Sequence, residues 1–158
     1  MGAELLPTGE QVAVEWLKAN VPYLQGFVAP SLPKESADWA QLGFVTVASI
    51  GGGRGSMPGE RISVVGLTYY GVALMSGKPP WKQTAQMVEQ VRAVVDPTGV
   101  AYAGTRGKYR LTNLGNQYLD ARVMNVEWLS EPQRRPGDTA DFAMFTNDIA
   151  LHWVVVNA

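Results

Sequence analysis

The sequence predicts a single α+β domain, residues 1–158, with the element order α–β–β–α–β–β. Three observations lead to this prediction. Two segments space their apolar residues as a helix does, four segments are β-branched or alternate apolar with polar residues, and the two kinds are interleaved along the chain. Because these elements must share one core, we expect an antiparallel or mixed sheet with both helices packed on one face.

The first predicted element is a helix from Thr8 to Val21. Thr8 suits the N-cap position, and Gln11 stands three residues later, where a capping box has its second partner. Its apolar face consists of Val12, Ala13, Trp16 and Leu17. Pro22 ends the helix, because proline lacks the backbone N–H that a helix interior needs.

Two predicted strands follow, Gly43–Ile50 and Arg61–Val72, both rich in β-branched and aromatic residues. Between them stand three consecutive glycines, Gly51–Gly53, and two more glycines. We expect the strands to pair as an antiparallel hairpin whose mobile tip is the glycine-rich stretch Gly51–Gly59.

The second half of the chain predicts one helix and two strands. The helix starts after Pro80, and its predicted buried face consists of Ala85, Val88, Val91, Arg92 and Val95. Residues 97–118 are glycine-rich and predict a functional loop. Leu119–Leu129 is the third predicted strand, and a long turn rich in proline and charge follows it. Phe142–Val156 is the closing strand, with a bulge expected near Asn147 and Asp148.

Composition excludes several classes of protein. Apolar residues make up 46% of the chain and charged residues 17%, which is typical of a globular domain. The formal net charge of -1 predicts no general attraction to nucleic acid or to an anionic membrane. With 0 cysteines, disulfides, thiol catalysis and cysteine-based zinc sites are excluded. The start of the chain lacks the pattern of a signal peptide, and we expect a soluble protein.

The glycine cluster does not match the common phosphate-binding motifs. A dinucleotide fingerprint needs glycine at the sixth position, but Ser56 stands there counting from Gly51. A predicted strand follows the cluster, so no helix N-terminus is available to hold a phosphate. Gly107-Lys108 is followed by Tyr109 and does not complete a Walker A motif. We therefore expect no cofactor.

Candidate catalytic residues are equally few. His152 is the only histidine, and the local sequence around it shows no carboxylate or nucleophile pattern, which favours a structural or surface role. Asp138 and Asp141 lie close together in a charged turn, where a solvated turn is favoured over a divalent-ion site. We expect no catalytic or metal-binding residues; a small enzyme using Gly51–Gly55 and His152 is the weaker alternative.

Interaction residues are the more promising candidates. Five tryptophans and few charges in a small domain, with sheet edges to cover, favour assembly into a dimer or a head-to-tail ring. The candidate interface residues are Arg54, Met57, Arg61, Arg106, Lys108, Arg134, Arg135 and Asp138. Arg106, Lys108 and Arg110 form a basic stripe with two tyrosines, a pattern that also suits nucleic acid, but the near-neutral chain favours a polar loop.

The chain resembles the tail terminator proteins of long-tailed phages, especially actinobacterial ones. Four stretches carry the resemblance: LPTGEQVAVEWLKANVP, GFVTVASIGGGRG, ERISVVGLTYYG with PPWKQTAQMVEQVRAVV, and VEWLSEPQRRPGDTADFAMFTNDIALHW. They are similar to the opening helix, the first strand, the second strand with the second helix, and the last hairpin of that family. Their order and spacing carry the match, over most of the chain.

The resemblance implies a structural virion protein that forms a ring, expected to be a hexamer, at the head-proximal end of the tail tube. Its implied partners are other copies of itself, the major tail tube protein and the head-side connector or stopper. The ring would be assembled in the host cytoplasm, and genome DNA would pass through it without specific binding. Our candidates for contact with neighbouring rings are the tip Gly51–Gly59 and the turn Arg134–Asp138, because exposed loops on a rigid sheet carry interactions. The alternative role is another neck component, such as a stopper or a connector completion protein.

Overall fold

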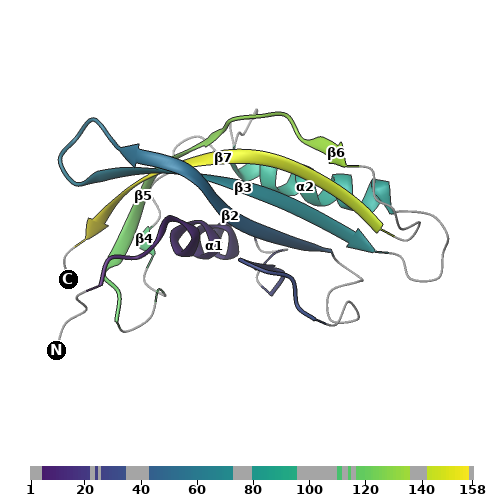
Figure 1. Cartoon of the computed structure of the whole chain (residues 1–158), viewed down its shortest axis with the longest axis horizontal. Helices are drawn as coiled ribbons and strands as arrows, with labels where there is room; N and C mark the ends of the chain where they lie inside the picture. The colour runs from purple at the N-terminus through teal and green to yellow at the C-terminus, as the bar shows by residue number, and fades with distance from the viewer. Residues whose placement is uncertain are drawn as a thin grey trace.

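Two helices and seven strands lie within the described part of the chain (Figure 1). A computed structural model of the protein describes residues 5–21, 24, 26–34, 43–72, 80–95, 110–111, 114, 117–135 and 142–156. In chain order the elements are α1 (Gly9–Asn20), β1 (Val28–Ala29), β2 (Phe44–Arg54), β3 (Glu60–Val72), α2 (Trp81–Val95), β4 (Arg110–Leu111), β5 (Asp120–Trp128), β6 (Gln133–Arg135) and β7 (Phe142–Val156). The fold is α+β, as predicted.

The described strands form one mixed, curled sheet (Figure 1). Their order is β1-β2-β3-β7-β5-β4, and β6 pairs with β7 next to β5. β1 runs parallel to β2, and the other pairs are antiparallel. β3 pairs with β7 over the whole length of β3, from Glu60↔Val154 to Val72↔Phe142. This central ladder is the frame to which every other part of the sheet is attached.

Helix α1 forms where the sequence predicts it. The Gln11 N–H donates to Thr8 Oγ1 at 3.2 Å, and the Thr8 N–H donates to Gln11 Oε1 at 2.8 Å, so the predicted capping box is confirmed. The helix buries the predicted apolar face and Val14 in addition. The Glu10 carboxylate accepts a hydrogen bond from the Ser49 N–H at 3.1 Å, which ties the first turn of α1 to β2.

Helix α2 starts after Pro80, as predicted, but buries a slightly different face. Its buried residues are Thr84, Met87, Val88, Val91 and Val95. Arg92 is not part of this face; its Nε donates to Glu89 Oε2 at 2.7 Å. The Thr84 hydroxyl donates to the Pro80 carbonyl at 2.8 Å, which lets a polar side chain be buried at the start of the helix.

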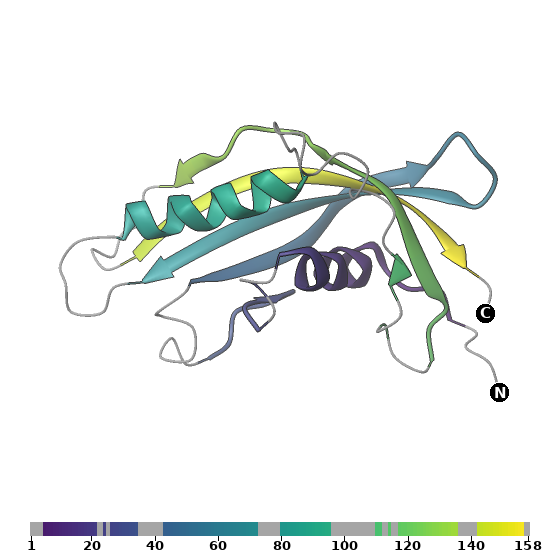
Figure 2. The ribbon, with the colours of Figure 1, turned by 180° about the vertical axis from the view of Figure 1, so that it is seen from behind.

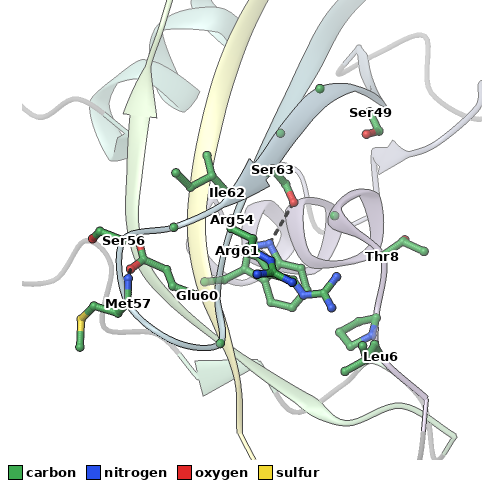
Figure 3. A pocket seen from close by; sticks show the side chains of 18 of the residues that line it. Leu6, Thr8, Ser49, Arg54, Ser56, Met57, Glu60, Arg61, Ile62 and Ser63 are labelled. Carbon is green, nitrogen blue, oxygen red and sulfur yellow. Dashed lines mark hydrogen bonds between the residues drawn. The ribbon is translucent and has the colours of Figure 1, made fainter.

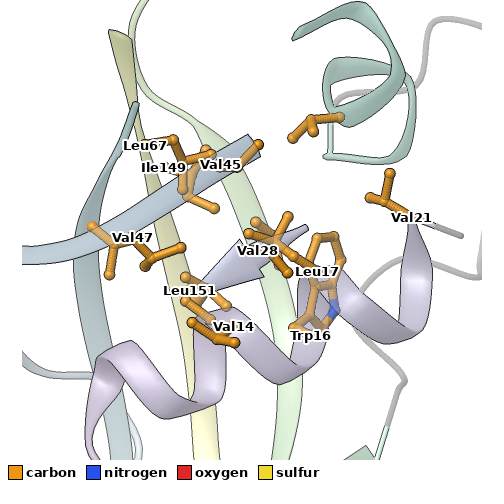
Figure 4. Packing of buried hydrophobic residues seen from close by; sticks show 14 of the residues in the cluster. Val14, Trp16, Leu17, Val21, Val28, Val45, Val47, Leu67, Ile149 and Leu151 are labelled. Atoms are coloured by element: carbon orange, nitrogen blue, oxygen red, sulfur yellow. The ribbon is translucent and has the colours of Figure 1, made fainter. Parts of the chain in front are cut away.

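Both helices cover the same face of the sheet, as predicted. On β3 the residues facing them alternate, and Val65, Leu67 and Tyr69 are fully buried. Buried residues of α1, α2, β2, β3, β5 and β7 form one continuous hydrophobic cluster. Figure 4 shows side chains of α1 packed against those of β2 and β7, and Figure 2 shows α2 lying along β7 and β3. The opposite face of the sheet has no helix on it among the described elements.

The glycine run differs from its prediction. Gly51, Gly52 and Gly53 do not form the hairpin tip but continue strand β2, paired with Val64, Ser63 and Ile62 of β3. Glycine has a low intrinsic preference for strands, so the pattern suggested a loop. The glycines are in a strand because their backbone groups pair with those of the neighbouring strand β3.

Two further corrections concern the last hairpin. The bulge expected near Asn147 and Asp148 is absent: β7 pairs with β3 without a register shift. Asp148 faces Gly66, which leaves room for its side chain, and its N–H donates to the Ser130 hydroxyl at 2.9 Å. Register shifts lie instead at Ser49/Gly51 in β2 and at Val123/Asn125 in β5. The predicted long turn also contains a strand, β6, which extends the ladder of β7.

Candidate interaction surface

The outer half of the β2–β3 hairpin projects away from the two helices (Figure 1). We call residues 51–64 the β2–β3 arm. At its end the Gly55 N–H donates to the Glu60 carbonyl at 2.9 Å, and the Glu60 N–H donates to the Met57 carbonyl at 3.1 Å. Gly59 adopts a φ of 80°, which suits the reversal of the chain. Met57 lies in this turn with 68% of its surface exposed.

The arm is anchored to the body of the sheet by its β3 strand. Arg61 to Val64 pair on one side with β2, and Glu60 to Val64 pair on the other side with Val154 to Ala150 of β7. The same β3 strand then continues into the core, where Leu67 and Tyr69 are buried. A displacement of the arm as a whole would therefore have to disturb the central ladder.

A groove of about 1250 Å³ lies beneath the arm, on the helix-covered face (Figure 3). Its walls come from three parts of the chain: residues 6–9 at the start of α1, the arm with Ser49, and Trp153 of β7. Exposed Leu6 and buried Pro7 contribute apolar surface. The groove therefore combines a backbone-rich wall of glycines with apolar and basic side chains.

Trp153 and Arg61 form the fixed part of this groove. The Trp153 indole N–H donates to Ser63 Oγ at 3.0 Å, and the side chain is 1% exposed. The Arg61 guanidinium lies 5.8 Å from the centre of the Trp153 ring, a cation–π contact that holds the arginine over the groove. Trp153 and Ser63 were not predicted as site residues, because only the sheet register brings them together.

Two arginines face each other across the arm. Arg54 and Arg61 are directly paired in the β2–β3 register, both are exposed, and Figure 3 shows them side by side. Like charges directly opposite on neighbouring strands repel each other. The remaining charged residue of the groove wall, Glu60, is turned to other partners: its carboxylate accepts from the Met57 N–H at 3.4 Å and contacts His152.

The predicted arginines of the last hairpin hold strand β6 to the body. The Arg134 guanidinium stacks on Trp81 of α2, with 4.0 Å to the ring centre, and Trp81 meets Phe145 edge to face at 5.7 Å. Arg135 Nε donates to the Thr146 hydroxyl at 3.1 Å. Both arginines are exposed. In the sheet, β7 separates them from β3, and they lie beside Phe145 and Met144, which pair with Tyr69 and Tyr70 and not with the arm.

His152 lies between two carboxylates, although the local sequence shows no such pattern. Its Nδ1 is 3.4 Å from Glu60 Oε1, and its Nε2 contacts Glu127 Oε1. The three side chains come from the adjacent strands β7, β3 and β5, and the glutamates are 92 and 25 residues from the histidine. This contact ties three strands together on the face that carries no helix.

Other predictions fall outside the described residues. These are the candidate residues Arg106, Lys108 and Asp138, the suggested Asp138–Asp141 ion site, and most of the glycine-rich segment 97–118. Within the residues that the structure describes, no group of three or more His, Cys, Asp or Glu side chains is arranged to hold a metal ion. None of the helices described is long and apolar enough to cross a bilayer.

No protein-family model matches the chain, and no curated protein does. Among solved structures, a chain from the virion of a native gene transfer agent particle matches with a TM-score of 0.47 and 12% sequence identity. The match covers 90% of this chain and 92% of that chain. A likeness at this level establishes neither the family nor the role of this chain.

Proposed function

We propose that this chain is a structural virion protein: a tail terminator that forms a ring, expected to be a hexamer, at the head-proximal end of a phage tail tube. In this role it stops growth of the tube and joins the tail to the head-side connector. Genome DNA passes through the ring without specific binding, and the chain catalyses no reaction. The sequence resemblance described above motivates the proposal, and the β2–β3 arm supports it.

The arm is the observation on which the proposal depends. It presents an exposed methionine, Met57, on a turn that is anchored through β3 to the centre of the core. Methionine adapts its shape to an apolar partner surface, and loops on a rigid sheet are common sites of protein contact. A rigid projection of this kind suits a surface that must fit the last ring of a tube.

Termination by such a protein needs surface complementarity and no chemistry. Rings in a tube stack through a contact between two different faces, and such a contact repeats without an end of its own. A ring that copies only one of these faces binds the last tube ring and leaves no face for the next. We assign the turn at the end of the arm, which carries Met57, to this contact with the tube.

The test uses the full-length chain together with the major tail tube protein of the same phage. Electron microscopy of the mixture is expected to show rings of the chain at one end of the tubes, and tubes that no longer grow. Met57→Glu is expected to keep its thermal unfolding temperature while binding to tube ends falls by about tenfold or more, because a charge would be buried at the contact.

Met124→Glu is the matched control, since Met124 is an exposed methionine on β5, a strand that does not belong to the β2–β3 turn carrying Met57. This variant is expected to bind tube ends as the natural chain does. The proposal is wrong if the natural chain binds no tube end. Binding to the head-side connector without any binding to tubes would indicate a stopper instead.

A further inference from the structure

We propose that the groove beneath the arm receives the acidic β5–β6 connection of a second copy, residues 129–132, and that this contact joins neighbouring subunits in the ring. The inference rests on the proposed function, because it names the surface through which the ring closes. It concerns the contact within a ring, whereas Met57 is assigned to the contact with the tube.

The paired arginines indicate an anionic occupant. Arg54 and Arg61 lie opposite each other with both side chains exposed, and neither forms an ion pair with a described residue. Arg61 is held in place by Trp153. Two unneutralised charges at adjacent positions repel each other, and a carboxylate placed between them would remove that repulsion.

The described part of the chain offers an exposed glutamate of the right kind. Among the described glutamates, Glu131 is exposed and forms no hydrogen bond or ion pair. The others are engaged by Ser49, Lys18, His152 and Arg92; they are Glu10, Glu15, Glu60, Glu89 and Glu127. Glu131 is therefore the described glutamate whose charge is free to meet a partner.

An apolar side chain accompanies this glutamate. Leu129 stands two residues before Glu131 and has 47% of its surface exposed. The groove offers apolar surface at Leu6 and Pro7 beside its arginines. The connection and the groove therefore match in charge and in apolar character, which is what a specific protein contact requires.

The two surfaces lie at different places along the central ladder. The arm belongs to β2 and β3, whereas the β5–β6 connection spans the other side of β7, between Trp128↔Ile149 and Gln133↔Thr146. Two different complementary surfaces of one subunit make a heterologous contact, which closes into a ring when the rotation between subunits permits. Figures 1 and 2 show both sides of the sheet.

Sedimentation velocity of the purified full-length chain, without tube protein, tests the inference. Arg54→Glu and Glu131→Arg are each expected to weaken self-association by about tenfold or more, and the double variant to restore it to within about threefold of the natural chain. Lys82→Glu, at an exposed position on α2, is the control and is expected to associate normally. Circular dichroism confirms that each variant is folded.

Several outcomes would overturn the inference. One is a natural chain that stays monomeric at all concentrations; another is normal association of both single variants, or a double variant that shows no recovery. If Arg54→Glu instead loses binding to a DNA oligonucleotide while self-association is unchanged, the arginines contact phosphate and the inference is wrong. If the Arg54→Glu variant forms rings normally and these rings cap tubes, the inferred contact between subunits is wrong but the proposed function still stands.

Discussion

The two halves of the β2–β3 hairpin share the same two strands but are held by different forces. In the body half, Val45 and Val47 of β2 face Tyr69 and Leu67 of β3, and all four are fully buried beneath the helices. In the arm half, β2 continues as exposed glycines and Arg54. Burial holds the first half, and backbone hydrogen bonds to β3 hold the second. The molecule thus separates the residues that determine stability from those available for contact.

The largest expected effect comes from the body half. Leu67→Ala removes a fully buried side chain beneath the helices and leaves a cavity, so the free energy of unfolding should fall by about 2–5 kcal/mol. Met57→Ala, a truncation at the exposed turn of the arm, should change it by less than about 0.5 kcal/mol. Urea unfolding of both variants measures the difference. Equal losses would show that the arm contributes to the core after all.

The second effect distinguishes glycines within the arm. Gly52 has a φ of 137°, and an added Cβ would meet the Ile62 carbonyl, so Gly52→Ala should lower the free energy of unfolding by about 1–3 kcal/mol. Gly53 has open space at its Cβ position. Gly53→Ala should be neutral or more stable by up to about 1 kcal/mol, because alanine restricts the unfolded chain. Thermal unfolding measures the stability of both variants. Equal unfolding temperatures for the two would contradict the strained geometry at Gly52.

A smaller effect is expected where the body meets the arm. Thr8 caps α1 and also lines the groove. Thr8→Ala removes the acceptor of the Gln11 N–H and should cost about 1 kcal/mol of stability, whereas Thr8→Ser keeps the hydroxyl and most of that energy. Chemical denaturation of the two variants checks this. If serine were as damaging as alanine, the methyl group rather than the cap would be the important part of Thr8.

The long elements were predictable from the sequence because their patterns are long. The capping box fixed the start of α1, and the alternation in Phe142–Val156 gave the bounds of β7 as they are observed. Strands of two or three residues, such as Val28–Ala29 and Gln133–Arg135, show no periodicity and were not predicted. They form only because a neighbouring strand offers its free backbone groups.

The candidate site was predictable only in part, since its geometry depends on register. Arg54 and Arg61 were both candidate interface residues, but their direct pairing depends on the bulge at Ser49/Gly51. The pattern of polar and apolar residues does not reveal this bulge. The contact of His152 with Glu60 joins residues 92 positions apart. Local patterns describe one strand at a time and do not reveal which strands become neighbours.

The smallest effect at neutral pH is expected at Tyr69, in the body half. Its hydroxyl is buried without a hydrogen-bond partner among the described residues, so Tyr69→Phe should raise stability by about 0.5–1 kcal/mol at pH 7. Desolvation by burial raises the pKa of Tyr69 well above its ordinary value. Above about pH 10 the tyrosine of the unfolded chain loses its proton, whereas the buried tyrosine of the folded chain keeps it. The free energy of unfolding of the natural chain should therefore fall by about 1.4 kcal/mol per pH unit. The Tyr69→Phe variant has no such group and should not show this loss.

Urea unfolding of both chains between pH 7 and pH 11 measures this difference, which should stay constant up to about pH 9.5 and then grow in favour of Tyr69→Phe. Tyr70→Phe is the matched control, because Tyr70 is the next residue of β3 and is only partly buried. A difference that stays flat through pH 11 would mean that Tyr69 ionises in the folded protein, and so that water reaches this part of the core. Burial would then contribute less to the stability of the body half than the comparison with the exposed arm suggests.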